Sequence, residues 1–287
     1  MASDDVPIDP PDFASSPSFE AKFVTEDDLE DLATFAGMTR EACLERLRSH
    51  ATAELTKAWH QANPKTTQEI LLFYRSTDLY VWELMQWHAS PARRPYWEAL
   101  ETFATRFAPN AGYRSVYDFG CGIGTDALFL AARGYEVTLV DVGGPAFRFA
   151  RHRFERRGIK ARFLESDSPF PSPDRKYDAI VCFDVFEHLE DPLRAVRLLV
   201  RALRPRGILV QVGNFEDAGL HPCHLSNGVR RFGGLRWHIH LAGLGLRHET
   251  SLLYRKLPVW RGAAQRLRFW LWWATGVWLV RVGRLRG

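Results

Sequence analysis

The stretch VYDFGCGIGTDALFLAARGYEVTLVD, residues 116–141, decides the fold. It places Gly120, Gly122 and Gly124 on alternate positions directly after an apolar run, and it ends on Asp141, seventeen residues after Gly124. Glycines in such a turn let the main chain bend sharply and approach a ligand closely, because no Cβ intervenes. The stretch predicts a strand, a glycine-rich turn, a helix and a second strand around a ligand site.

The spacing of the glycines indicates the kind of ligand. In the dinucleotide fingerprint GxGxxG a glycine would stand at Thr125, so here the third glycine comes one residue early. Asp118 precedes the glycines, and a carboxylate at Asp141 can accept hydrogen bonds from both hydroxyls of an unphosphorylated ribose. We therefore expect a nucleoside without a pyrophosphate. The alternative for Asp141 is an ordinary helix or turn cap.

Pattern and composition divide the chain into four regions. The 287 residues are 46% hydrophobic, which suffices for a buried core. We predict a disordered acidic leader over 1–24, a helical lid or substrate region over 25–110, an α/β domain over 111–256 and a Trp/Arg-rich amphipathic segment over 257–287. In the α/β domain, helices predicted to begin at Thr125, Pro145 and Pro192 alternate with short strand-like runs. These runs are SVYDF, EVTLVD, ARFLES, YDAIVCFD, GILVQVG and LRHETSLL. Such alternation predicts a doubly wound, mostly parallel sheet with helices on both faces.

Charge and cysteine usage narrow the class of protein. Residues 1–33 carry ten acids and one base, residues 251–287 carry eight bases and no acid, and the part between is nearly balanced. This disfavours nucleic-acid binding, because polyanion binders concentrate positive charge on one face. The arginine-rich run RFARHRFERRG, residues 148–158, is expected to turn its arginines to water. The four cysteines are widely spaced, which suits a reducing cytoplasm and argues against a disulfide framework or a zinc knuckle.

Over residues 115 to about 253, roughly half of the chain, the sequence resembles the class I, Rossmann-like S-adenosylmethionine (SAM)-dependent methyltransferases. Five motifs in the family's order carry the resemblance. They are the glycine motif VYDFGCGIG, the ribose-binding acid Asp141, the adenine-contacting pair Ser166 and Asp167, the segment CFDVFEHLEDP after the fourth strand, and LRPRGILVQV at the start of the fifth. The segment CFDVFEHLEDP, residues 182–192, is similar to the one that closes over the methionine end of the cofactor.

The resemblance implies SAM as cofactor and S-adenosylhomocysteine (SAH) as product. The cofactor-binding residues that it implies are Asp118, Gly120, Gly122, Gly124, Asp141, Val142, Asp167 and Asp184. Asp118 and the glycine turn would hold the amino-acid end, and Asp167 would accept from the adenine amine. Val142 and Phe170 would pack against the adenine faces. For Asp167 the alternative is a turn, because Ser-Asp-Ser-Pro is a good turn sequence.

The candidate catalytic residues are histidines. If the acceptor is a hydroxyl, a base must take its proton, and histidine is suited to that near neutral pH. His188 follows the fourth strand at the carboxyl edge of the sheet, where ligands of open α/β folds bind. His221 and His224 follow the fifth strand. The alternative for each is a structural or partly exposed histidine.

A metal is a competing interpretation of the same segment. Asp184, Glu187 and His188 are spaced like the E-x-x-E-H metal motif of the ubiquinone-biosynthesis O-methyltransferases, with Asp in place of the first acid. A divalent ion there would polarise a hydroxyl or bind a diphosphate. Glu-His at this place also occurs in family members that use no metal, and we expect none here.

The helical region suggests what is methylated. Residues 76–97 are dense in aromatic side chains, which suits a small apolar, aromatic or lipid-like acceptor, with Tyr80 and His88 as further candidates for contact. The alternative is a helical core packed on the domain. The sequence leaves open whether oxygen, nitrogen or carbon receives the methyl group. The alternative functions are an RNA or protein methyltransferase and a non-catalytic, membrane-associated SAM-binding scaffold.

The C-terminal region has a twelve-residue apolar run, residues 269–280, with arginines on both sides. The run is too short to cross a bilayer, but tryptophan and arginine suit a helix in the headgroup region. We expect a cytoplasmic protein with peripheral contact to the inner face of the membrane. The alternatives are a terminal helix packed on the fold and a dimer interface, and oligomeric state stays open. A final antiparallel hairpin, expected in many relatives, has no clear counterpart here.

Overall fold

The computed structural model describes residues 25–49, 51–213, 223–225, 239, 242, 244–248, 253–258 and 262. The predicted leader and almost all of the predicted C-terminal amphipathic segment lie outside these residues, so both stay predictions. Among the residues described, no helix has the length and apolar character needed to cross a bilayer.

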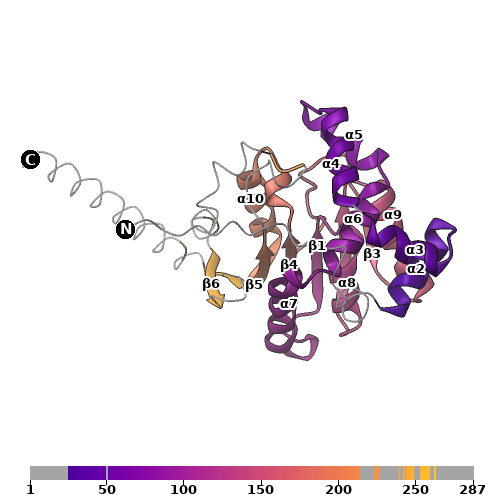
Figure 1. The fold of residues 1–287 in the computed structure, drawn as a ribbon. Coiled ribbons are helices and arrows are strands. Elements are labelled where there is room, and N and C mark those ends of the chain that lie inside the picture. The colour runs from indigo at the N-terminus through magenta and orange to yellow at the C-terminus, as the bar shows by residue number, and fades with distance from the viewer. Residues whose placement is uncertain are drawn as a thin grey trace, which may run out of the picture.

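A seven-stranded sheet forms the centre of the fold, in the order β3-β2-β1-β4-β5-β7-β6 (Figure 1). The strands are β1 (Ser115–Phe119), β2 (Glu136–Asp141), β3 (Arg162–Glu165), β4 (Tyr177–Phe183), β5 (Leu203–Val212), β6 (Leu244–His248) and β7 (Leu253–Lys256). The first five strands run parallel to one another, and β7 is antiparallel to both β5 and β6. Every residue of β1 and β4 is buried, as expected for central strands covered on both faces.

Helices cover both faces of the sheet. Helices α7 (Arg94–Arg106), α8 (Thr125–Ala131) and α9 (Pro145–Arg156) pack in one apolar layer against the sheet, and α10 (Pro192–Ala202) packs in the other. The predicted starts at Thr125, Pro145 and Pro192 are confirmed. The sequence prediction of a doubly wound, mostly parallel sheet is therefore confirmed.

The edge of the sheet differs from the prediction. The run LRHETSLL, residues 246–253, is predicted as one strand, and the sequence shows no clear final hairpin. Instead β6 and β7 form an antiparallel pair, with Leu246 opposite Tyr254. The run contains neither Gly nor Pro to mark the reversal of the chain.

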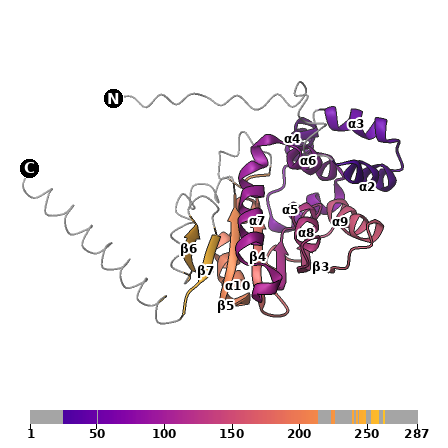
Figure 2. The same cartoon turned by 90° about the horizontal axis from the view of Figure 1, so that it is seen from below.

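Six α-helices occupy the N-terminal described region, which the sequence predicts to be helical. Besides α7 they are α2 (Glu26–Ala36), α3 (Arg40–Arg48), α4 (Ala51–Ala62), α5 (Thr67–Ser76) and α6 (Leu79–His88). The capping boxes of Thr25 with Asp28 and of Thr66 with Glu69 are both present, so each helix start follows from local sequence. Figure 2 shows α2 to α6 gathered beside α8 and α9.

The expectation that the arginines of residues 148–158 face water is wrong for Arg153. The side chain of Arg153 is only 1% exposed and pairs with Asp28 and Asp31 of α2. Arg156 and Arg157 pair with Asp31 as well. The acids of α2 supply the partners that a buried guanidinium needs, which the pattern of α9 alone cannot reveal.

Candidate functional site

A cavity of about 260 Å³ opens at the carboxyl edge of β1, β2 and β4. Its sheet side consists of the glycine turn, the end of β2, the loop after β3 and residues 183–190 after β4. Helices α4, α5 and α6, with Arg93, contribute the opposite side, and His224 and Leu225 complete the lining. We call the side formed by α4 to α6 the roof. The cavity thus joins the predicted cofactor site to the predicted lid.

The glycine turn determines the shape of the cavity, but its three glycine N–H groups are not free to donate hydrogen bonds to a ligand. Gly120, Gly122 and Gly124 all have positive φ, at 72°, 52° and 73°, so the turn requires glycine. Gly120 and Gly122 line the cavity. Gly124 does not, because it packs helix against sheet: a Cβ there would lie 3.0 Å from Leu139. The N–H groups of all three glycines already donate within the protein, to Val140, Asp141 and Cys121.

Asp141 lines the cavity at the end of β2. Its Oδ2 accepts from the N–H of Gly122 at 2.8 Å, and its Oδ1 accepts from the N–H of Val142 at 2.7 Å. Burial raises the pKa of Asp141, while the two N–H groups act to lower it. A carboxylate has about four lone-pair sites, so two further hydrogen bonds remain possible. This fits the paired hydroxyls of a ribose.

Carboxylates gather beneath the glycine turn. Asp118 is 4% exposed and does not line the cavity, and its Oδ2 accepts no hydrogen bond from the described residues. Burial, Asp126 and Asp141 raise the pKa of Asp118 well above its usual value. Asp126, which lines the cavity, forms a buried ion pair with Arg93. Sequence reasoning missed both members of this pair. Asp126 stands two positions after Gly124, within the glycine motif's own segment, but no local pattern marks Arg93. The surplus of negative charge fits a ligand with a cationic end.

Asp184 follows β4 and also lines the cavity. It has a φ of 50°, a left-handed conformation that is uncommon outside glycine and often marks a functional site. Its carboxylate accepts from Nε1 of Trp87 at 3.0 Å and from the hydroxyl of Tyr96 at 2.5 Å. Aromatic side chains of α6 and α7 therefore hold this acid in place.

On the side predicted for adenine, Val142 and Phe170 line the cavity, but Asp167 does not. The side chain of Asp167 is 99% exposed and pairs with Arg75 of α5. Arg75 also donates to the carbonyls of Val142 and Ser166, at 2.6 and 2.8 Å. Arg75, which sequence reasoning missed, thus ties the roof to two loops of the sheet side.

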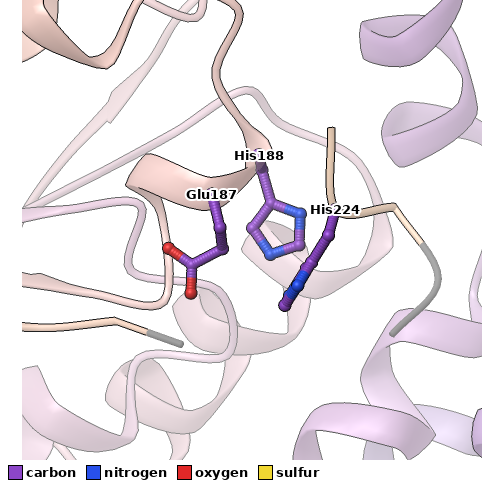
Figure 3. Close-up of side chains that lie close together, drawn as sticks. All are labelled: Glu187, His188 and His224. Atoms are coloured by element: carbon purple, nitrogen blue, oxygen red, sulfur yellow. The ribbon is translucent and has the colours of Figure 1, made fainter. Parts of the chain in front are cut away.

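The structure brings together His188 and His224, whose ring centroids lie 4.9 Å apart (Figure 3). Nδ1 of His188 lies 3.0 Å from the carbonyl oxygen of Cys223 and 3.3 Å from the hydroxyl of Tyr74. Because a carbonyl only accepts, the hydrogen-bond network assigns the proton to Nδ1 and makes Nε2 the acceptor nitrogen. His221 lies outside the described residues.

The alternative metal set of Asp184, Glu187 and His188 does not come together. Glu187, His188 and His224, rather than Asp184, offer ligand atoms within 4.8 Å of one another. Figure 3 shows His188 between the other two side chains. Asp184 is directed elsewhere by its hydrogen bonds to Trp87 and Tyr96. The E-x-x-E-H-like spacing therefore does not predict the arrangement of these side chains.

Taken together, the parallel sheet, the glycine turn and Asp141 form an α/β domain with a cavity at its carboxyl edge, where the sequence predicts a nucleoside. Comparison with known proteins gives the family. The family model described as "Methyltransferase domain" matches residues 117–211. Over these residues the chain is therefore similar to the class I, Rossmann-like SAM-dependent methyltransferases, as the sequence resemblance predicted.

Individual relatives match part of the chain. The ubiquinone biosynthesis O-methyltransferase of Rickettsia conorii is 26% identical over 170 residues, 59% of this chain and 56% of that protein. A protein of Mycobacterium tuberculosis named as a probable SAM-dependent methyltransferase is 36% identical over 105 residues, 37% of each chain. Among solved structures, an O-methyltransferase of a Brevibacillus brevis polyketide synthase, in complex with SAH, is 20% identical with a TM-score of 0.37, covering 42% of this chain and 40% of that one. The chain thus spans about half or less of these relatives.

Proposed function

We propose that the protein transfers the methyl group of SAM to a hydroxyl of a small, largely apolar acceptor. One observation carries the proposal: a single cavity contains the glycine turn and Asp141 on one side and the apolar and aromatic side chains of α4 to α6 on the other. The relatives named as O-methyltransferases support oxygen as the methyl acceptor.

The residues of the sheet side fit the cofactor. SAM, when bound, supplies an activated methyl group on a sulfonium that is a good leaving group. Asp141 accepts from the ribose hydroxyls, and Val142 and Phe170 pack against the adenine. The acidic surroundings of Asp126 and Asp184 favour the cationic end of the ligand. This division of roles follows the lining of the cavity.

The roof holds the acceptor and excludes water. Leu55, Ile70, Leu71 and Trp87 line this side, and an apolar enclosure orients an acceptor against the methyl donor while keeping water out. A hydroxyl must also lose its proton to a basic group. The sequence predicts His188 for this step, and His188 lines the cavity.

Calorimetric titration with SAH tests the proposal at its first step. We expect micromolar binding, about −8 kcal/mol, by the wild type. Asp141→Ala should weaken binding by about 100-fold, because it removes charge-assisted hydrogen bonds to the ribose. The matched control is Asp174→Ala, since Asp174 is a partly exposed acid paired with Arg162 and does not line the cavity. Absence of binding by folded wild type, or equal binding by the two variants, would contradict the proposal.

A further inference from the structure

One face of helix α6 forms much of the roof. Tyr80, Glu83, Leu84, Trp87 and His88 line the cavity, three or four residues apart as one helical face requires. Glu83 is the one acid in this helix. An acid on a face that is otherwise aromatic or apolar calls for an explanation, because burying a carboxylate without a partner is costly.

The surroundings of Glu83 are those expected of a carboxyl group that takes part in proton transfer. Its side chain is half-buried, and within the described part of the chain no hydrogen bond or ion pair to it is found. The titratable groups that interact with it are Asp184 after β4, Tyr80 on α6 and Cys223. Burial and then the negative charge of Asp184 raise the pKa of Glu83 to about 7. A carboxyl of that kind is basic enough to take a proton near neutral pH.

His188 is the competing base, and its contacts suit a different task. Its ring is held by the carbonyl of Cys223, the hydroxyl of Tyr74 and the ring of His224. The N–H of Leu225 donates to the carbonyl of Glu187 beside it. Through Nδ1 the histidine attaches residues 223–225 to the segment after β4, which is a structural role. The variants compared below separate this role from proton transfer through Nε2.

We infer that Glu83 contacts the acceptor hydroxyl and takes its proton during methyl transfer, while His188 fixes residues 223–225 against the sheet. The inference rests on the proposed function and identifies the group that takes the proton of the acceptor hydroxyl. In the balanced step, the acceptor oxygen forms a bond to the methyl carbon, the bond from that carbon to sulfur breaks, and the hydroxyl proton moves to the carboxylate of Glu83. The sulfonium becomes a neutral thioether, and the neutral carboxylic acid later returns its proton to water.

The test compares Glu83→Gln, His188→Gln and the control Glu45→Gln, an exposed position on α3. Butylcatechol is the acceptor probe, and methylation is followed between about pH 5 and pH 9. We expect the wild-type kcat to fall below about pH 7 and Glu83→Gln to lower kcat at neutral pH by about 100-fold and remove this inflection. His188→Gln should keep the inflection, and Glu45→Gln should match the wild type.

Difference infrared spectroscopy of the full chain without ligands adds a readout that does not depend on turnover. We expect a carboxylic acid band that titrates near neutral pH in the wild type and is absent from Glu83→Gln. Identical titrations of the two proteins, or an inflection lost in His188→Gln but kept in Glu83→Gln, would overturn the inference. Either result can occur while SAH binds and butylcatechol is methylated, so it leaves the proposed function standing. Loss of SAH binding by the wild type would overturn the proposed function itself.

Discussion

The two sides of the cavity are built in different ways. The sheet side comes from three stretches, residues 116–143, 168–171 and 183–190, in which each functional residue stands at the end of a strand or a few positions after it. The roof comes from α4 to α6 and Arg93, which precede these strands and reach them only through tertiary contacts. Local spacing therefore encodes the sheet side, whereas long-range packing encodes the roof. The experiments below disturb the junction between the two sides.

The largest effect is expected at Arg93, which joins the roof to the first turn of α8. Arg93→Met removes the partner of Asp126 from a pair whose side chains are only 2% and 10% exposed. We expect the free energy of unfolding to fall by about 3 to 5 kcal/mol, because an uncompensated buried charge remains. Urea unfolding followed by circular dichroism measures it.

The neighbouring residue provides the control for Arg93. Arg94 pairs with Glu98 on the surface, with side chains 80% and 55% exposed. Arg94→Met should change stability by less than about 0.5 kcal/mol. If the two substitutions lower the free energy of unfolding equally, the ion pair of Arg93 with Asp126 does not hold the two sides of the cavity together.

The next effect is expected at Gly144, where α5 rests on the loop after β2. A Cβ at Gly144 would lie 2.7 Å from Cα of Arg75 and 2.8 Å from the carbonyl oxygen of Tyr74, both of them main-chain atoms. Gly144→Ala should cost about 2 to 4 kcal/mol and weaken SAH binding, because α5 must move and Arg75 loses its carbonyl partners. Gly158→Ala, also at positive φ but with open space around it, should cost only about 1 kcal/mol. An equal loss of stability in Gly144→Ala and Gly158→Ala would mean that α5 does not pack closely against the loop after β2.

The sequence predicted the sheet, the starts of α8 to α10 and part of the sheet side, because each follows from a local pattern. The predicted residues Asp118, Gly124 and Asp167 do not line the cavity. Asp141, Val142 and His188 line the cavity as the motifs led us to expect. It could not predict Arg75, Glu83 or Arg93. The residues that they interact with, Asp126, Val142 and Asp184, lie between 33 and 101 positions away in sequence. The same limitation led to the wrong expectation for Arg153.

A smaller effect on stability, dependent on pH, is expected at His88 of the roof. Burial, Arg93 and Arg153 lower the pKa of His88 well below its ordinary value of 6.5. As the pH falls below about 6.5 the unfolded chain takes up a proton that the folded protein does not, so stability is lost, by at most about 1.4 kcal/mol per pH unit. His88→Gln should remove this part of the slope, whereas His60→Gln, at an exposed position, should keep it. Urea unfolding at several pH values checks this, and parallel slopes for wild type and His88→Gln would contradict it.

The smallest effect is expected at Asp167, where motif and structure differ most. The motif predicts a contact with the adenine amine, yet the side chain is exposed and pairs with Arg75 outside the cavity lining. An exposed ion pair contributes little, so Asp167→Asn should weaken SAH binding by no more than about fivefold in calorimetry. Arg75→Gln should weaken it further, because Arg75 also donates to the carbonyls of Val142 and Ser166. A loss at Asp167 as large as that at Asp141 would show that the ligand draws this acid into the cavity. The part of the cavity that contacts the adenine would then form only when the ligand binds, and the ligand would determine part of the shape of the sheet side.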